Sequence, residues 1–94
     1  MKPSSAPVEA ALPPAVFEAL LQVERLLGIP RGEWTRVPAV RSLVEAVAVA
    51  HAREELEAAG TSRTQATRIA ALRLGLNEEA VERRLRRWRV DALK

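Results

Sequence analysis

Residues 70–88 read AALRLGLNEEAVERRLRRW, and this stretch decides the fold. It indicates two short helices joined by a tight turn. Gly75 stands where the first helix has to end, because glycine adopts the left-handed backbone conformation at little cost. Asn77 can cap the second helix by accepting a hydrogen bond from a backbone N–H that has no partner within the helix. A helix, a glycine turn and a capped helix form the helix-turn-helix unit, which places its second helix in the major groove of DNA.

The second helix of this unit, expected over residues 77–89, is amphipathic. Val81, Leu85 and Trp88 fall at positions i, i+4 and i+7 and predict its buried face. The charged side chains then face mainly outward; they are Glu78, Glu79, Glu82, Arg83, Arg86, Arg87 and Arg89. In a functional interpretation, the arginines contact DNA phosphates, and each contact adds salt-dependent affinity through counterion release.

The same charges also have a purely structural interpretation. Acids in the first turn and arginines in the last turn complement the helix dipole, each by roughly 0.3–1 kcal/mol. Glu79 with Arg83, and Glu82 with Arg86, are i, i+4 pairs in the favourable orientation, worth about 0.2–0.5 kcal/mol each. The glycine turn, the capping asparagine and the apolar spacing favour DNA binding over this alternative.

Composition sets the size and type of the core. A chain of 94 residues makes one domain. Because 48% of the residues are hydrophobic but only 3% are aromatic, the core has to be built from alanine, leucine and valine. Small side chains fill a monomeric core of this size poorly, which favours a dimer that shares its core. The chain has no cysteine, so disulfides and thiolate metal sites are excluded.

The net charge of +3 is unevenly distributed. Residues 1–60 carry six basic and eight acidic side chains, whereas residues 61–94 carry nine basic and four acidic ones. The basic excess therefore lies in the part of the chain that carries the helix-turn-helix. No apolar run approaches the roughly 20 residues of a membrane span, and the first residues lack the apolar centre of a secretory signal. We therefore expect a cytoplasmic protein without a membrane partner.

Along the chain, the pattern predicts an all-α fold of four helices in three regions. Residues 1–13, rich in proline, are expected to form a flexible arm. Residues 14–60 are expected to form a helical dimerisation region, and residues 61–94 a helix-turn-helix region. The expected helices span residues 14–27, 38–59, 61–74 and 77–89. Trp34, in the connection between the first two, is expected to fill a gap between helices.

The helix over residues 38–59 predicts how the chain assembles. Its segment 43–50 reads LVEAVAVA, which is apolar on nearly every side of a helix. A helix that is apolar all round is buried all round. Because one copy of so short a chain can hardly surround it, we predict that this helix packs against its copy in a second subunit.

Nothing in the sequence indicates an enzyme. His51 is the only histidine, and we expect it to be packed or half-exposed, because a metal would need partners that the sequence does not supply. Asp91 is the only aspartate, the glutamates lie on helix surfaces, and there is no glycine-rich phosphate loop. We therefore predict no catalytic residue, cofactor, metal or small-molecule substrate.

Residues 70–88 resemble the C-terminal DNA-binding unit of Fis, the factor for inversion stimulation, which also ends many bacterial enhancer-binding activators. The shared pattern is a pair of alanines and a leucine, a glycine, an aliphatic residue and a polar cap. Two basic residues, a leucine, two more basic residues and an aromatic residue follow, and the correspondence needs no gap. The resemblance implies that two N-terminal helices form a homodimer. It also implies that the protein binds double-stranded DNA in the bacterial nucleoid, as a regulator of transcription or of nucleoid architecture.

The resemblance and the charge pattern together give a set of candidate DNA-binding residues. Asn77 falls on the family's cap beside the phosphate backbone. The full set is Ser62, Arg63, Arg68, Asn77, Glu78, Glu82, Arg83, Arg84, Arg86, Arg87 and Arg89, of which Arg83, Arg84, Arg86 and Arg87 fall on the family's basic positions.

Glu78 and Glu82 depart from the family, which has basic side chains where the recognition helix meets the base edges. A carboxylate there repels phosphate, although it can accept a hydrogen bond from a cytosine amino group. Either the base preference differs, or the scaffold serves another purpose. The alternative is an all-helical protein-interaction module, such as an adaptor or inhibitor of the transcription machinery, without DNA binding.

Overall fold

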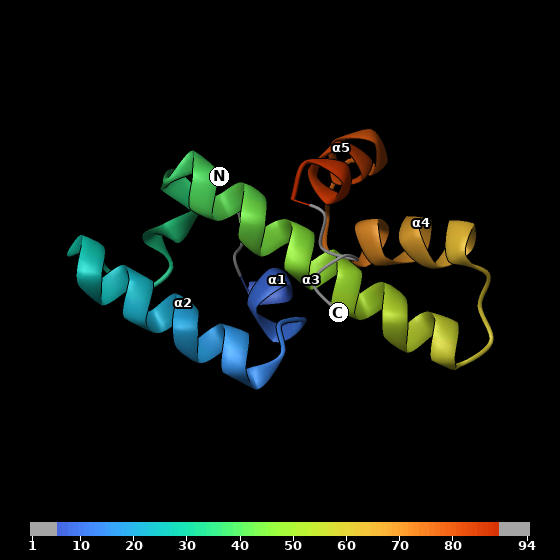
Figure 1. The fold of residues 1–94 in the computed structure, drawn as a ribbon, viewed down its shortest axis with the longest axis horizontal. Helices are drawn as coiled ribbons and strands as arrows, with labels where there is room; N and C mark the ends of the chain where they lie inside the picture. Colours follow the sequence, from blue (N-terminus) through green and yellow to red (C-terminus); the bar gives the residue numbers. More distant parts are fainter. Residues whose placement is uncertain (1–5, 89–94) are drawn as a thin grey trace.

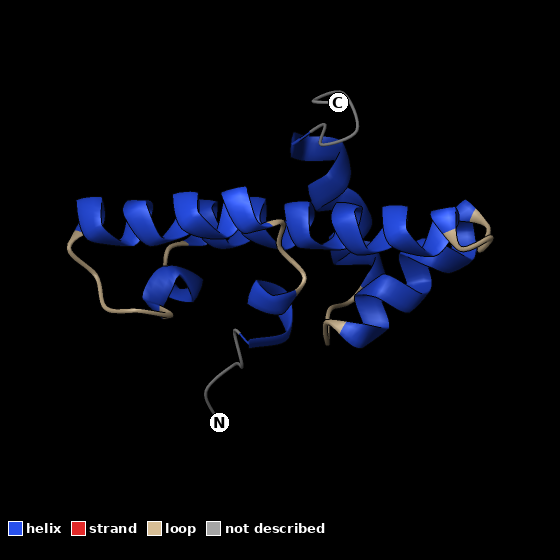
Figure 2. Cartoon of the chain, turned by 90° about the horizontal axis from the view of Figure 1, so that it is seen from below, coloured by secondary structure: helices blue, strands red, loops and turns tan. Residues whose placement is uncertain are grey.

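The computed structural model describes residues 6–88, and every regular element in that range is helical (Figures 1 and 2). The elements are α1 (Ala6–Ala10), α2 (Pro14–Leu27), the 3₁₀-helix η1 (Glu33–Arg36), α3 (Pro38–Ala58), α4 (Arg63–Arg73) and α5 (Glu78–Trp88). The all-α class is confirmed. The predicted number of four helices is wrong, because α1 forms within the segment that was expected to be an arm. No helix in the described range is both long and apolar enough to cross a membrane.

The arm prediction is wrong for residues 6–13. Pro7 falls in the first turn of α1, where its fixed φ angle suits a helix and its missing N–H costs nothing. Val8 and Leu12, four residues apart, are 3% and 7% exposed and belong to the main core. Two buried aliphatic side chains thus hold this proline-rich segment against the fold. Residues 1–5 of the expected arm lie outside the described residues.

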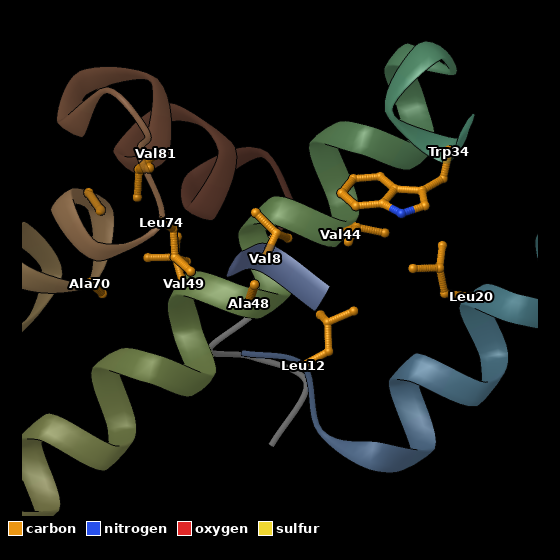
Figure 3. Close-up of a cluster of buried hydrophobic side chains, with 11 residues drawn as sticks. Val8, Leu12, Leu20, Trp34, Val44, Ala48, Val49, Ala70, Leu74 and Val81 are labelled. Carbon is orange, nitrogen blue, oxygen red and sulfur yellow. The ribbon is translucent and has the colours of Figure 1, made fainter. Parts of the chain in front are cut away.

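The core is centred on α3. Both α4 and α5 pack against α3, and α1 and η1 also contact it (Figure 1). Figure 3 shows the cluster around Val44, Ala48 and Val49 of α3, with side chains converging on it from the other elements. A smaller cluster joins Ala46 and Ala50 of α3 to the end of α5.

One chain therefore buries most of the apolar segment 43–50, although Leu43 remains 37% exposed, so the argument that one copy can hardly cover this helix is wrong. Ala48 and Val49 are completely buried and Ala46 is 1% exposed without any second copy. A short chain can cover this helix because the alanines on α3 allow the neighbouring helices to approach closely. The elements α4 and α5 provide cover that was expected from a second subunit.

In contrast, α2 lies at the edge of the molecule in the view of Figure 1, with α1 between it and α3. Leu20 and Glu24 are its buried residues. Leu26 is 86% exposed and Leu27 is 52% exposed, so much of its apolar surface faces solvent.

A polar network fixes α2 to α1 and η1. The guanidinium group of Arg31 bridges two carboxylates: its Nη2 donates to Glu9 Oε1 at 2.6 Å, and its Nη1 donates to Glu24. The backbone N–H of Gly32 donates to Glu24 Oε2 at 2.7 Å, and the Trp34 indole donates to Glu9 Oε2 at 2.7 Å. Trp34 is 1% exposed, as expected of a tryptophan that fills a gap between helices. The hydrogen bond to Glu9 is the main cause that raises the pKa of Arg31, although burial opposes it.

We expect Arg31→Met to destabilise the fold far more than Arg36→Met. The first substitution removes the cation beside Glu24, whose side chain is 3% exposed, and breaking such a pair costs about 3 kcal/mol. Arg36 pairs with Glu33 at the surface, 72% exposed, and its loss should cost less than about 1 kcal/mol. Urea unfolding of the two variants measures the difference; equal losses would contradict the structural role of the network.

Candidate nucleic-acid interface

The predicted turn between α4 and α5 is present. Gly75 has a φ of +69° in the left-handed region, and α4 ends before it. The N–H of Gly75 donates to the carbonyl of Leu72 at 3.1 Å, and the N–H of Leu76 donates to that of Ala71 at 2.9 Å. These two bonds form the Schellman arrangement that ends helices at a glycine. The chain is therefore not one continuous helix through residues 70–85.

Asn77 caps α5 as predicted. Its side-chain Oδ1 accepts a hydrogen bond from the backbone N–H of Ala80 at 3.1 Å. Leu76, between the turn and the cap, is half-buried and packs against the main core. The local signals for the corner in residues 70–80 were thus sufficient to place it.

Both ends of α5 are held against the rest of the fold. Near its start, Val81 is 1% exposed and packs in the cluster that contains Ala70 and Leu74 of the preceding segment (Figure 3). At its end, Trp88 packs against the alanines of α3, and its indole N–H donates to the Ser42 hydroxyl at 2.9 Å. Because Val81 and Trp88, seven residues apart, both pack against the rest of the fold, the opposite face of α5 remains exposed.

That exposed face carries three arginines, Arg83, Arg86 and Arg87. The sequence offered Glu79 and Glu82 as their i, i+4 partners. Within residues 6–88, however, neither Arg83 nor Arg86 forms an ion pair with a carboxylate. The expected helix-stabilising pairs, Glu79 with Arg83 and Glu82 with Arg86, are therefore not formed.

Arg84 has a different role from its neighbours. Its side chain is only 26% exposed, and its Nη1 lies 2.9 Å from Oε1 of Glu45 on α3. Glu45 is 5% exposed at its side chain, and Arg41 is its second cation at 3.5 Å. A buried carboxylate needs a cation beside it, so Arg84 serves the fold and does not face outward with the other arginines.

The acidic side of α5 adjoins α4. Arg68 Nε lies 3.6 Å from Glu78 Oε2; the Arg68 side chain is exposed and that of Glu78 is half-buried. Glu82 is one turn beyond Glu78 on the same stripe and is exposed. The arginine at position 68 is thus partly neutralised by a residue that was predicted to lie in the same interface.

The remaining predicted residues lie at the ends of the two helices. Ser62 is the N-cap of α4, where its hydroxyl accepts from the N–H of Gln65 at 3.4 Å. Arg63 is the first residue of α4 and is exposed. Arg89 lies outside the described residues.

His51 is half-buried, as expected, and its Nδ1 lies 3.1 Å from the carbonyl oxygen of Ala11. It therefore joins α3 to the connection between α1 and α2. Across residues 6–88, no group of three or more histidine, cysteine, aspartate or glutamate side chains is arranged to hold a metal ion.

Sequence reasoning missed two residues that shape this surface, Ser42 and Glu45. Glu45 could have been found, because a single carboxylate inside the apolar run LVEAVAVA has to meet a cation once that run is buried. Ser42 gave no such signal, since its partner Trp88 lies 46 residues away along the chain.

No protein-family model, curated protein or solved structure matches this chain. The resemblance to the Fis unit therefore rests on residues 70–88 alone.

We expect Gly75→Ala to lower the free energy of unfolding by about 1–2 kcal/mol, the cost of an L-residue in the left-handed conformation. A Cβ at this position meets no atom within 4 Å, so the backbone alone causes the loss. Gly75→Asn is the matched control and should cost less, because asparagine tolerates this conformation better than alanine. Thermal or urea unfolding measures both; an unchanged Gly75→Ala variant would mean that the turn does not constrain the corner.

Proposed function

We propose that this chain is a helix-turn-helix DNA-binding protein that acts as a homodimeric regulator of transcription or of nucleoid architecture in bacteria. The observation that carries the proposal is the exposed face of α5. Arg83, Arg86 and Arg87 lie there on a helix that the Gly75 turn separates from α4.

The chemistry of this face suits phosphate better than bases. An exposed guanidinium without a carboxylate partner can form charge-assisted hydrogen bonds to a phosphate without first breaking an ion pair. Glu78 and Glu82 on the same helix repel the backbone, but they can accept hydrogen bonds from cytosine amino groups in the major groove. Affinity then comes mainly from backbone contacts, and sequence preference is modest.

Duplex DNA of random sequence, titrated at rising salt, tests the proposal. The wild-type protein should bind at low salt and lose affinity steeply as salt rises. Arg83→Gln with Arg87→Gln should weaken binding to all sequences and reduce the slope of log K against log salt by about 2, roughly one unit per phosphate contact.

The matched control is Arg36→Gln, which removes one positive charge from an exposed position on η1, outside the α5 face and the α2 surface. It should leave the salt slope unchanged, whereas Arg83→Gln alone should reduce the slope by about 1. Equal effects of these two single variants would contradict an interface on α5.

A protein-interaction module is the second candidate, and the acidic side of α5 favours it. Glu78 partly neutralises Arg68. Both Glu79 and Glu82 are exposed, and Leu72 at the end of α4 is 80% exposed. An apolar side chain near mixed charges suits a protein partner such as a component of the transcription machinery. Absence of duplex binding at micromolar protein and low salt would favour this candidate over DNA.

The homodimer in this proposal needs a surface other than α3, and α2 supplies it. Ala15, Ala19 and Leu26 are exposed and fall at i, i+4 and i+11, along one side of the helix. Glu18 and Arg25, two turns apart, flank that side and are exposed as well. In an antiparallel two-fold pairing, Leu26 lies on the small Ala15 of the partner subunit, and Glu18 faces Arg25 of the partner subunit.

Charge reversal tests this pairing. Glu18→Arg alone and Arg25→Glu alone should each place like charges opposite one another and shift the protein toward monomer. The double variant restores opposite charges and should restore the dimer. Sedimentation equilibrium measures the mass, and circular dichroism checks that each variant remains folded. A wild-type monomer at high concentration would contradict the dimer, and a double variant no better than the singles would contradict this surface.

A further inference from the structure

A hollow of about 330 Å³ lies between α3 and the basic side of α5. Its lining residues are Ser42, Ala80, Arg83, Arg84 and Arg87. Four of the five lie on α5 at i, i+3, i+4 and i+7, which is one stripe of a helix. The small side chain of Ala80 leaves space between the longer ones.

The charges around the hollow do not cancel. Arg84 is neutralised by Glu45. Arg83 and Arg87 have no carboxylate partner among residues 6–88, so they leave two positive charges at its rim. The guanidinium of Arg87 lies 5.6 Å from the centroid of the Trp88 ring, a cation–π contact that limits its motion and leaves its N–H groups available.

Ser42 adds a neutral donor from α3. Its oxygen accepts the hydrogen bond of the Trp88 indole at 2.9 Å, and its own O–H has no acceptor among the described residues. A serine hydroxyl can accept and donate at the same time. The indole bond therefore holds the Ser42 oxygen in place while its hydrogen remains available to a ligand.

We propose that this hollow binds a phosphate-class oxyanion. Arg83 and Arg87 form charge-assisted hydrogen bonds to its oxygens, and Ser42 donates a third bond from α3. A phosphate of the DNA backbone and a free phosphate or pyrophosphate share this chemistry. For DNA the inference rests on the proposed function, and it makes α3 part of the interface; for free phosphate it stands without that function.

The Trp88 indole N–H reports occupancy directly, because it is bonded to Ser42. In ¹H–¹⁵N spectra, inorganic pyrophosphate should shift the Trp88 indole resonance saturably, whereas sodium chloride at matched ionic strength should not. The Trp34 indole is buried and bonded to Glu9, so its resonance should not move and serves as an internal control.

Variants assign the site. Arg83→Gln and Arg87→Gln should each weaken pyrophosphate binding about tenfold, the effect of one charge-assisted hydrogen bond. Arg36→Gln, an equal loss of charge on η1, should have no effect. Ser42→Ala should weaken binding and Ser42→Thr should retain it, with thermal unfolding to check that α5 stays in place. A Trp88 shift that chloride reproduces, or that survives loss of both arginines, would overturn the proposal.

A parallel titration with duplex DNA distinguishes a backbone phosphate from a free phosphate, and DNA binding from anion binding in the hollow. If duplex DNA moves the same Trp88 resonance and pyrophosphate competes with it, the occupant is a backbone phosphate. If pyrophosphate binds but duplex does not, the hollow takes free phosphate and the DNA-binding function fails. If duplex binds while the Trp88 resonance responds to neither probe, DNA binding stands and this inference is overturned.

Discussion

The structure depends on the burial of one helix, α3, by the rest of a short chain. Its middle segment is apolar on nearly every side, so leaving any side exposed would lose the hydrophobic free energy that holds the domain together. The element α1 and the 3₁₀-helix cover α3 from one part of the chain, and the α4–α5 corner covers it from another (Figure 1). The α4–α5 corner is thus not an appendage of the fold. It is half of the cover of its own core, so damage to the corner should also affect the fold.

Burial of a carboxylate within that helix orients α5. Glu45 requires a cation, and Arg84 supplies it from the side of α5 that faces α3. Residue 84 points toward α3, and Trp88 is hydrogen-bonded to Ser42. Because of the helical repeat, positions 83, 86 and 87 then face solvent. The exposure of these arginines is therefore a consequence of a buried ion pair. Arg84 pairs with Glu45, and this pair orients α5 so that the other arginines face solvent.

Local signals predicted local structure well. The turn at Gly75, the cap at Asn77 and the helices that became α2, α3, α4 and α5 all depend on residues a few positions apart, where periodicity and capping rules apply. Pairings across the chain could not be read in this way. The hydrogen bond between Ser42 and Trp88, the cover of α3, and the anchoring of α1 through Val8 join segments that no short-range rule connects. Composition indicated that α3 is buried, but not which residues bury it, so it could not show that the cover comes from the same chain.

The distribution of charge on α5 bears on how a nucleic acid would lie against it. The basic edge, Arg83 and Arg87, adjoins the N-terminal half of α3, whereas the acidic edge, Glu78 and Glu82, adjoins α4. A helix with equal charge on both edges could sit centrally in a major groove and contact both phosphate strands. With this asymmetry, the strand beside α3 is attracted and the strand beside α4 is repelled, unless Arg68 and Arg63 compensate on that side. Binding would then tilt α5 toward one strand, and its acids would approach the base edges, where a carboxylate can select cytosine. The same glutamates that depart from the Fis pattern would in that geometry become the residues that distinguish one sequence from another.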